Sequence, residues 1–113
     1  MLQKYSHFMR EANLIDGQWV QADSGATIDV TNPATGGVIG TIPRSGTAET
    51  RRAIEAAEKA FQSWRKVSVT ERHKLLRRLH DVMMDNLQPL GELLTMEQGK
   101  SLAEAKGEIG SGA

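Results

Sequence analysis

The chain has 113 residues, carries 14 Lys and Arg against 14 Asp and Glu, and contains no cysteine. The lack of cysteine excludes disulfide bonds and thiolate metal sites within the chain. No segment approaches the roughly 18 apolar residues of a membrane span, and no apolar segment of the signal-peptide type follows the start, so we expect a cytoplasmic protein without a membrane partner.

The first part of the chain predicts an N-terminal arm followed by strands and turns. Residues 1–12 are expected to form the arm, as a frayed or docked short helix, and residues 13–46 to form a strand region. Within that region Asp16-Gly17 lies between the apolar pairs Leu14-Ile15 and Trp19-Val20. This pattern predicts a β-hairpin, because both central residues of its tight turn must tolerate positive φ.

Further strands are predicted before the helices begin. Ile28 and Val30 alternate with polar residues and lead into Asn32-Pro33, where the residue before proline is held extended and a turn then opens. After Gly36-Gly37 another strand is expected over residues 38–42. The strand region then ends near residue 46.

Residues 47–109 predict about four helices, which makes the fold class of this chain α+β. The first helix is expected to run from Thr47, as its cap, to about Trp64, with Glu49 near the positive end of the helix dipole. Apolar side chains recur in this helix at steps of three and four and form one stripe. The stripe consists of Ala53, Ile54, Ala57, Phe61 and Trp64.

The second helix is expected to open with a capping box, in which Ser68 and Glu71 each accept a backbone N–H of the other. Its apolar stripe consists of Leu75, Leu76, Leu79, Val82, Met83 and Leu87. Four short helices and a few strands do not cover stripes that face in so many directions. We therefore expect the isolated chain to be marginally stable, partly unfolded or associated with copies of itself.

Two shorter helices complete the predicted elements. Pro89 fits the first turn of the third helix, and Gly99 is expected to end it in a left-handed conformation. Ser101 with Glu104 predicts a capping box for the fourth helix. Residues 110–113 have the composition of a flexible linker, and we expect them to be a non-helical, artificial tail.

Charge is distributed unevenly along the helical part. Residues 44–78 hold ten Lys and Arg against four Glu, whereas residues 79–113 hold two Lys against six Asp and Glu. A basic stretch that contains Trp64 raises the question of nucleic-acid binding. The charges fall at helical spacings and alternate in sign, as on solvated helix faces, so we expect no nucleic-acid partner.

Two pairs of side chains on the second helix resemble ligand pairs. His73 and His80 lie about 10.5 Å apart along the helix axis, too far to share one ion, and we expect ordinary surface histidines. Asp81 and Asp85 share a face, but two carboxylates alone rarely hold a cation. Neither pair is taken as a site.

Three blocks of sequence resemble the amino-terminal region of the aldehyde dehydrogenase superfamily. They are LIDGQWV at 14–20, NPATG at 32–36 and EQGKSLAEA at 97–105, in that order and spacing. The resemblance extends over residues 13–109. Within the superfamily the sequence of residues 28–34 and 103–109 is most similar to bacterial succinate-semialdehyde dehydrogenases.

The resemblance implies a fragment of a larger enzyme with an α/β fold. It assigns residues 47–109 to the helical part of a Rossmann-like cofactor-binding domain, with the strands of 13–46 packed beside that domain. The implied full-length enzyme is a homo-oligomer that uses NAD or NADP to oxidise an aldehyde, succinate semialdehyde to succinate. The implied partner of this chain is the remainder of the dehydrogenase chain.

The resemblance also implies that this chain carries none of the catalytic groups. The family reaction needs a cysteine nucleophile, an amide that stabilises the oxyanion and a carboxylate base, and in the family all of these and the cofactor loops lie downstream. We expect no catalytic residue, no bound cofactor and no activity in the isolated chain. The alternative is a free-standing helical binding or assembly module without enzymatic activity.

One candidate metal site follows from the resemblance. Some aldehyde dehydrogenases hold a structural alkali cation through backbone carbonyls just before the Asn-Pro turn and a carboxylate before the Gly-Lys pair; the matching positions are Val30, Thr31 and Glu97. Oxygen donors suit a hard cation. Many members carry Asp where this chain has the longer Glu97, which without a cation is a plain helix-end acid.

Overall fold

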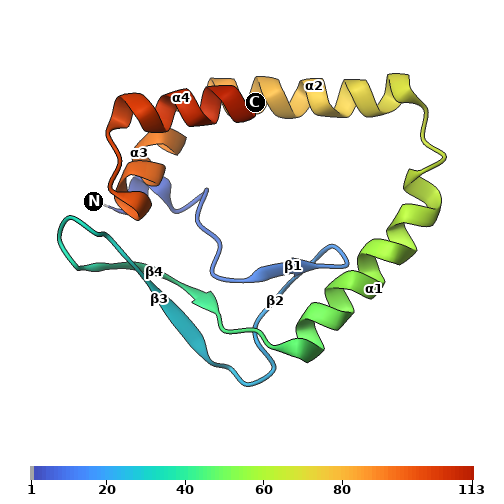
Figure 1. Ribbon diagram of the computed structural model, residues 1–113, viewed down its shortest axis with the longest axis horizontal. Helices are drawn as coiled ribbons and strands as arrows, with labels where there is room; N and C mark the ends of the chain where they lie inside the picture. The colour runs from blue at the N-terminus through green and yellow to red at the C-terminus, as the bar shows by residue number, and fades with distance from the viewer. Residues whose placement is uncertain (1) are drawn as a thin grey trace.

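The computed structural model describes residues 2–113, with side chains from residue 4 onward, as an open frame of strands and helices (Figure 1). A short 3-10 helix opens the chain, and four strands and four helices follow it. The elements are η1 (Leu2–Tyr5), β1 (Asn13–Ile15), β2 (Gln18–Val20), β3 (Thr27–Thr31), β4 (Val38–Pro43), α1 (Thr47–Trp64), α2 (Val69–Asp85), α3 (Leu87–Gln98) and α4 (Leu102–Gly112). The predicted α+β class with about four helices is confirmed.

The strands form two separate two-stranded antiparallel sheets. In the first, Leu14 pairs with Trp19, and the turn between them has φ values of 50° at Asp16 and 75° at Gly17. This is the positive-φ turn that the sequence predicts. In the second sheet β3 pairs with β4, and the register shifts after Val30. Neither sheet is large enough to be stable without packing against other elements.

The first turn of α1 differs from the prediction. Gly46, in an extended conformation, is the N-cap, and Thr47 is the first helical residue. The reason is Glu49, whose carboxylate accepts the backbone N–H of Gly46 at 3.1 Å and that of Asp23 at 2.7 Å. A carboxylate reaching back from the third helical position thus fixes the helix start one residue earlier than a threonine cap would.

The other helix ends largely follow the sequence. Ser68 accepts the N–H of Glu71 at 3.2 Å, but the Glu71 carboxylate pairs with Lys74 at 2.9 Å, so the structure shows only one half of the predicted box. At the start of α4 both halves of the box between Ser101 and Glu104 are present. Capping chemistry read from the sequence therefore places both helix starts correctly.

The last two helices cross closely. Gly99 ends α3 with a φ of 75°, as predicted. A β-carbon on Gly91 would lie 2.7 Å from Cγ of Lys106, so the glycine lets α3 approach α4. Ala105 is fully buried at this crossing. Contrary to the expected flexible tail, α4 continues as helix through residues 110–112, because its backbone hydrogen bonds continue to the end despite the low helix propensity of glycine.

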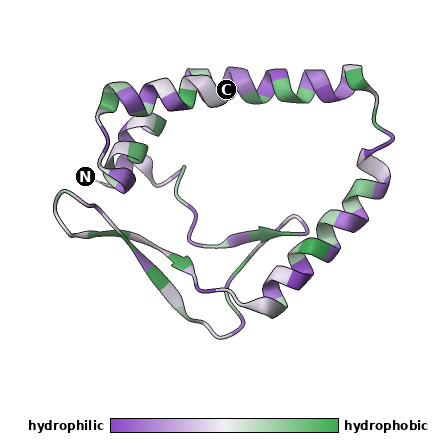
Figure 2. Cartoon of the chain, in the orientation of Figure 1, coloured by the Kyte–Doolittle hydropathy of each residue, from purple (hydrophilic) through white to green (hydrophobic). Residues whose placement is uncertain are grey.

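The frame has almost no interior. Among the described residues the buried apolar side chains are those of Tyr5, Ala22, Pro43 and Ala105, and no large side chain is fully buried. Apolar positions recur along the surfaces of the helices and strands (Figure 2). The radius of gyration is 16.7 Å, whereas a compact domain of this length has about 13 Å. None of the helices within residues 2–113 is long and apolar enough to cross a membrane.

Candidate functional site

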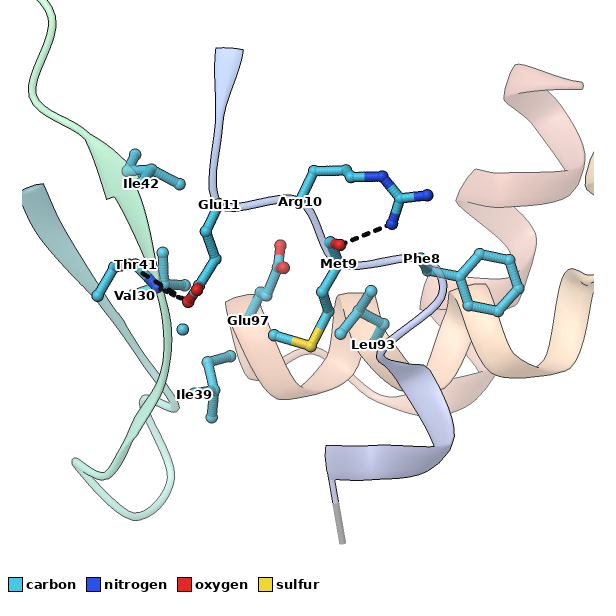
Figure 3. Close-up of a pocket in the computed structure, with 11 residues that line it drawn as sticks. Phe8, Met9, Arg10, Glu11, Val30, Ile39, Thr41, Ile42, Leu93 and Glu97 are labelled. Carbon is cyan, nitrogen blue, oxygen red and sulfur yellow. Dashed lines mark hydrogen bonds between the residues drawn. The ribbon is translucent and has the colours of Figure 1, made fainter. Parts of the chain in front are cut away.

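A small cavity forms where three parts of the chain meet. It encloses about 120 Å³ between the N-terminal arm, the β3–β4 sheet and α3 (Figure 3). The arm contributes residues 8–11, the sheet contributes Val30 and residues 39–42, and α3 contributes Leu93 and Glu97. The walls are mostly apolar, and the carboxylates of Glu11 and Glu97 are the acidic groups that line it.

The cavity unites two of the three predicted cation ligands. Val30 and Glu97 both line it, whereas Thr31 does not. Thr31 lies just past the cavity, opposite Val38, where the sheet register shifts. Carbonyl and carboxylate oxygens are the donors a hard cation requires, so the chemistry of Val30 and Glu97 fits such an ion.

The N-terminal arm adds a second carboxylate that the sequence did not indicate. Glu11 accepts the backbone N–H of Thr41 at 2.8 Å, which fixes the arm on β4. The Met9 side chain also lies against β4. A β-carbon added at Gly40 would be 3.1 Å from the terminal methyl group of Met9. These contacts are about thirty residues apart in the sequence, and no local pattern in residues 1–12 predicts them.

The start of the arm is fixed on α3 by a polar cluster. The Tyr5 hydroxyl donates to the Glu92 carboxylate, the Gln88 amide donates to it at 2.8 Å, and the Lys4 ammonium lies 2.9 Å away. These groups lower the pKa of Glu92 to about 2, and the hydrogen bond from the Tyr5 hydroxyl has the largest effect. The contact with Tyr5 and Glu92 also raises the pKa of Lys4. The arm is therefore docked rather than frayed.

A second polar cluster connects α1 to the loop after β2. Arg52 donates two hydrogen bonds, at 2.7 and 2.9 Å, to the Asp23 carboxylate. The Arg52 guanidinium lowers the pKa of Asp23, and the backbone N–H of Asp23, with those of Glu49 and Gly46, lowers the pKa of the buried Glu49. Both carboxylates are engaged with the fold, so this cluster is structural.

Outside the cavity, the other residue types that commonly form metal or catalytic sites can be located individually. The chain has no cysteine. Within residues 2–113 no three His, Cys, Asp or Glu side chains lie close enough to hold a metal ion. Asp81 forms an ion pair with Arg77 at 3.3 Å on the α2 surface. The arrangement resembles part of a scaffold, in which polar clusters fix helices and strands to one another.

Comparison with known proteins defines the class to which this scaffold belongs. Residues 19–113 match the model of the Aldehyde dehydrogenase family. The chain belongs to the aldehyde dehydrogenase family, and it corresponds to the amino-terminal portion of that family's enzymes.

Two of the relatives are named for semialdehyde substrates, and both are much longer than this chain. The chain is 57% identical over 106 residues to a glutarate-semialdehyde dehydrogenase of Pseudomonas putida, covering 94% of this chain and 22% of the relative. It is 48% identical to an NADP(+) succinate-semialdehyde dehydrogenase of Escherichia coli, covering 92% of this chain and 22% of that enzyme. The chain therefore spans about a fifth of the length of these relatives.

Solved structures show the same frame. A crystal structure of an E. coli NADP-dependent enzyme superposes with a TM-score of 0.90 and 48% identity, covering 93% of this chain and 22% of that one. A succinate-semialdehyde dehydrogenase from Burkholderia pseudomallei superposes with a TM-score of 0.89 and 50% identity, covering 92% and 22%. The fold predicted from the resemblance is thereby confirmed for this portion.

Proposed function

We propose that this chain is the non-catalytic amino-terminal portion of an NAD(P)-dependent dehydrogenase whose substrate is a short aldehyde with a carboxylate at its other end. The observation that carries the proposal is the identity of 57% to a semialdehyde dehydrogenase over 94% of this chain and only 22% of the relative. The substrate expected from the sequence was succinate semialdehyde. Glutarate semialdehyde is the competing substrate, because relatives at 57 and 55% identity carry its name.

The contribution of this chain to the reaction is structural. The aldehyde is attacked by a cysteine thiolate in the proposed mechanism, and the chain has no cysteine. The nucleotide cofactor accepts a hydride when bound, and the residues that hold it belong to the remainder of the polypeptide. The clusters around Glu92 and Glu49 hold the elements of the frame together, and the frame in turn supports that remainder.

A fused protein tests the proposal directly. In the fused enzyme this chain replaces the matched amino-terminal segment of the P. putida glutarate-semialdehyde dehydrogenase. We expect the purified fusion to reduce NAD⁺ or NADP⁺ with succinate or glutarate semialdehyde, and the 113-residue chain alone to be inactive. A fusion that folds and assembles like the parent enzyme but oxidises neither aldehyde would refute the proposal.

The fused enzyme also tests the remaining expectations about assembly. We expect a cytoplasmic homo-oligomer, since the implied parent enzyme is one. Native mass spectrometry of the fusion gives the number of subunits, and fractionation of the source cells gives the compartment. A monomeric fusion with full activity would contradict the expected oligomer.

A structural cation at the small cavity is the second part of the proposal. Its support is that Val30 and Glu97 line one cavity, with Thr31 next to it. We expect K⁺ or Na⁺ to raise the melting temperature of the fused enzyme relative to a bulky organic cation. Replacing Glu97 with Ala should abolish this difference, whereas Glu58→Ala on α1 should preserve it. A cation effect that survives Glu97→Ala would rule the site out.

The alternative of a free-standing binding module draws on the exposed apolar residues of α1 and α2. An antibody raised against residues 44–106 would detect the protein in its natural source. A mass several times that of the 12.4 kDa chain supports the dehydrogenase proposal, whereas a mass near 12.4 kDa supports the module.

A further inference from the structure

The N-terminal arm is anchored on both sides of the small cavity. On one side the Tyr5 hydroxyl donates to the Glu92 carboxylate of α3. On the other side Glu11 accepts the backbone N–H of Thr41, on β4, at 2.8 Å. Residues 8–11 lie between these anchors and form one wall of the cavity (Figure 3). The docked arm therefore closes the cavity between α3 and β4.

The docked arm brings a second carboxylate to a cavity that has no neutralising basic group. Glu11 comes from the arm and Glu97 from α3, and neither belongs to the ion pairs found among the described residues. Arg10 also lines the cavity, but its guanidinium donates to the carbonyls of His7 and Met9 at 3.0 and 2.8 Å. Figure 3 shows this guanidinium directed away from Glu11. Docking of the arm therefore adds negative charge that no described side chain at the cavity neutralises.

Glu11 keeps acceptor capacity while it fixes the arm. It accepts the backbone N–H of Thr41 at 2.8 Å and the Thr41 hydroxyl at 3.3 Å, both through the same oxygen, Oε1. An ionised carboxylate accepts through both of its oxygens, so Oε2 remains able to accept. Sites for hard cations bind more tightly as they gain charged oxygen ligands. Without a cation, the charges of Glu11 and Glu97 repel each other and oppose docking of the arm.

We propose that docking of the N-terminal arm and binding of the structural cation are coupled through Glu11. This inference rests on the cation of the proposed function, and it adds Glu11, as a second charged group, to Val30 and Glu97. A bound alkali cation offsets the charge that Glu11 brings to the cavity and thereby holds the arm in its docked position. By thermodynamic reciprocity, the docked arm strengthens cation binding by the same factor. The order of the arm therefore depends on the cation.

Hydrogen exchange of the Thr41 amide measures docking of the arm, because this N–H donates to Glu11. It is followed in the fused enzyme with K⁺, with Na⁺ and with tetramethylammonium at equal ionic strength. We expect exchange to be slower by about fivefold or more with at least one of the two alkali cations, which is the lower end of ordinary coupling between sites. The Arg44 amide donates to the Ala26 carbonyl instead of to the arm. It should show no such difference.

Three variants of the fused enzyme separate the charge of Glu11 from its hydrogen bond. Glu11→Gln keeps an oxygen that accepts the Thr41 N–H but has no charge, so the alkali-cation effect on Thr41 exchange should be lost. Glu97→Gln removes the repulsion, and in tetramethylammonium it should slow Thr41 exchange by about two- to fivefold, the range of exposed charge pairs. Glu58→Gln, on the exposed surface of α1, should leave the alkali-cation effect unchanged. An equal effect in Glu11→Gln and in the unmodified fusion would overturn the inference.

The melting temperature of the fusion separates this inference from the proposed function. An alkali-cation effect on the melting temperature that Glu97→Ala abolishes, together with a Thr41 amide that does not respond to the cation, would refute the coupling and leave the cation site intact. A fusion in which the cations alter neither property would refute both. Neither measurement depends on aldehyde oxidation. Cation-dependent protection of Thr41 that Glu11→Gln abolishes would therefore support the coupling even in a fusion that oxidises neither aldehyde.

Discussion

At the scale of single residues, Gly99 joins two motifs that are far apart in the sequence. It has a φ of 75° and ends α3. A β-carbon at this position would lie 2.8 Å from Cγ of Pro33, in the turn between β3 and β4. Glycine is therefore required at position 99 for two reasons. It adopts the left-handed conformation easily, and it leaves room for the proline ring.

The contact with Pro33 can be separated from the backbone requirement by two substitutions. Gly99→Ala should destabilise the fused enzyme by about 2–4 kcal/mol, from left-handed strain plus the clash. Gly25 has a φ of 70°, but a β-carbon there would meet no atom within 4 Å, so Gly25→Ala should cost only about 1 kcal/mol. Denaturant unfolding of both variants measures the difference, and equal costs would show that Pro33 yields without penalty.

The polar cluster at Glu92 makes docking of the arm sensitive to acid. The pKa of the Glu92 carboxyl group is lowered to about 2 from an ordinary 4.5. The stabilisation of the docked arm by ionised Glu92 is therefore complete above pH 4.5 and is lost as the pH falls toward 2. Tyr5 is the only tyrosine of the chain, and NMR of its ring reports the arm directly. We expect its signals to move to unfolded positions between pH 4.5 and 2.

The Glu92→Gln variant gives the control for this acid sensitivity. An amide still accepts the Tyr5 hydroxyl but has no charge for Lys4, so the arm should be more weakly docked at neutral pH and should lose this pH dependence. Glu58→Gln on the exposed surface of α1 should behave like the unmodified chain. Identical titrations of the Tyr5 ring in all three proteins would show that another group controls the arm.

At the scale of elements, local chemistry predicted most of the frame. The turn at Asp16 and Gly17 and the end of α3 at Gly99 follow from conformations that few residues adopt, and such signals act over a few residues only. The start of α1 was misplaced because Glu49 also bonds to Asp23, a long-range contact. The helical conformation of residues 110–112 at the end of α4 was not predicted. Their composition is typical of flexible linkers, but the backbone hydrogen bonds of the helix continue through them.

Helix caps should contribute independently of the surrounding frame. Ser101→Ala removes the hydroxyl that accepts the N–H of Glu104 at 3.3 Å, and we expect a loss of about 1 kcal/mol in the fused enzyme. Ser63→Ala is the matched control, since the Ser63 hydroxyl donates to the carbonyl of Ala60 near the end of α1. That bond contributes nothing to a helix or slightly weakens it. Thermal unfolding that ranks Ser63→Ala as the more harmful variant would contradict this assignment.

At the scale of the whole molecule, the candidate site could be predicted only in part. The resemblance placed Val30 and Glu97 together, and the structure puts both at one cavity. Glu11 and Met9 were not foreseen, because they reach the cavity through docking of the arm on β4. Long-range contacts of this kind depend on how the elements pack against one another. The sequence pattern of a single element does not show which other elements it will contact.

The absence of an interior has a consequence for the isolated chain. With no large side chain fully buried among the described residues, little apolar burial opposes the conformational entropy of the unfolded chain. We expect the 113-residue chain to melt over a broad range without a cooperative transition, and to associate at high concentration through its exposed apolar side chains. Calorimetry measures the first property and sedimentation velocity the second. A sharp, reversible transition from a monomer would show instead that the polar clusters at Glu92 and Glu49 suffice to hold the frame. The frame would then be a unit that folds without the rest of the enzyme.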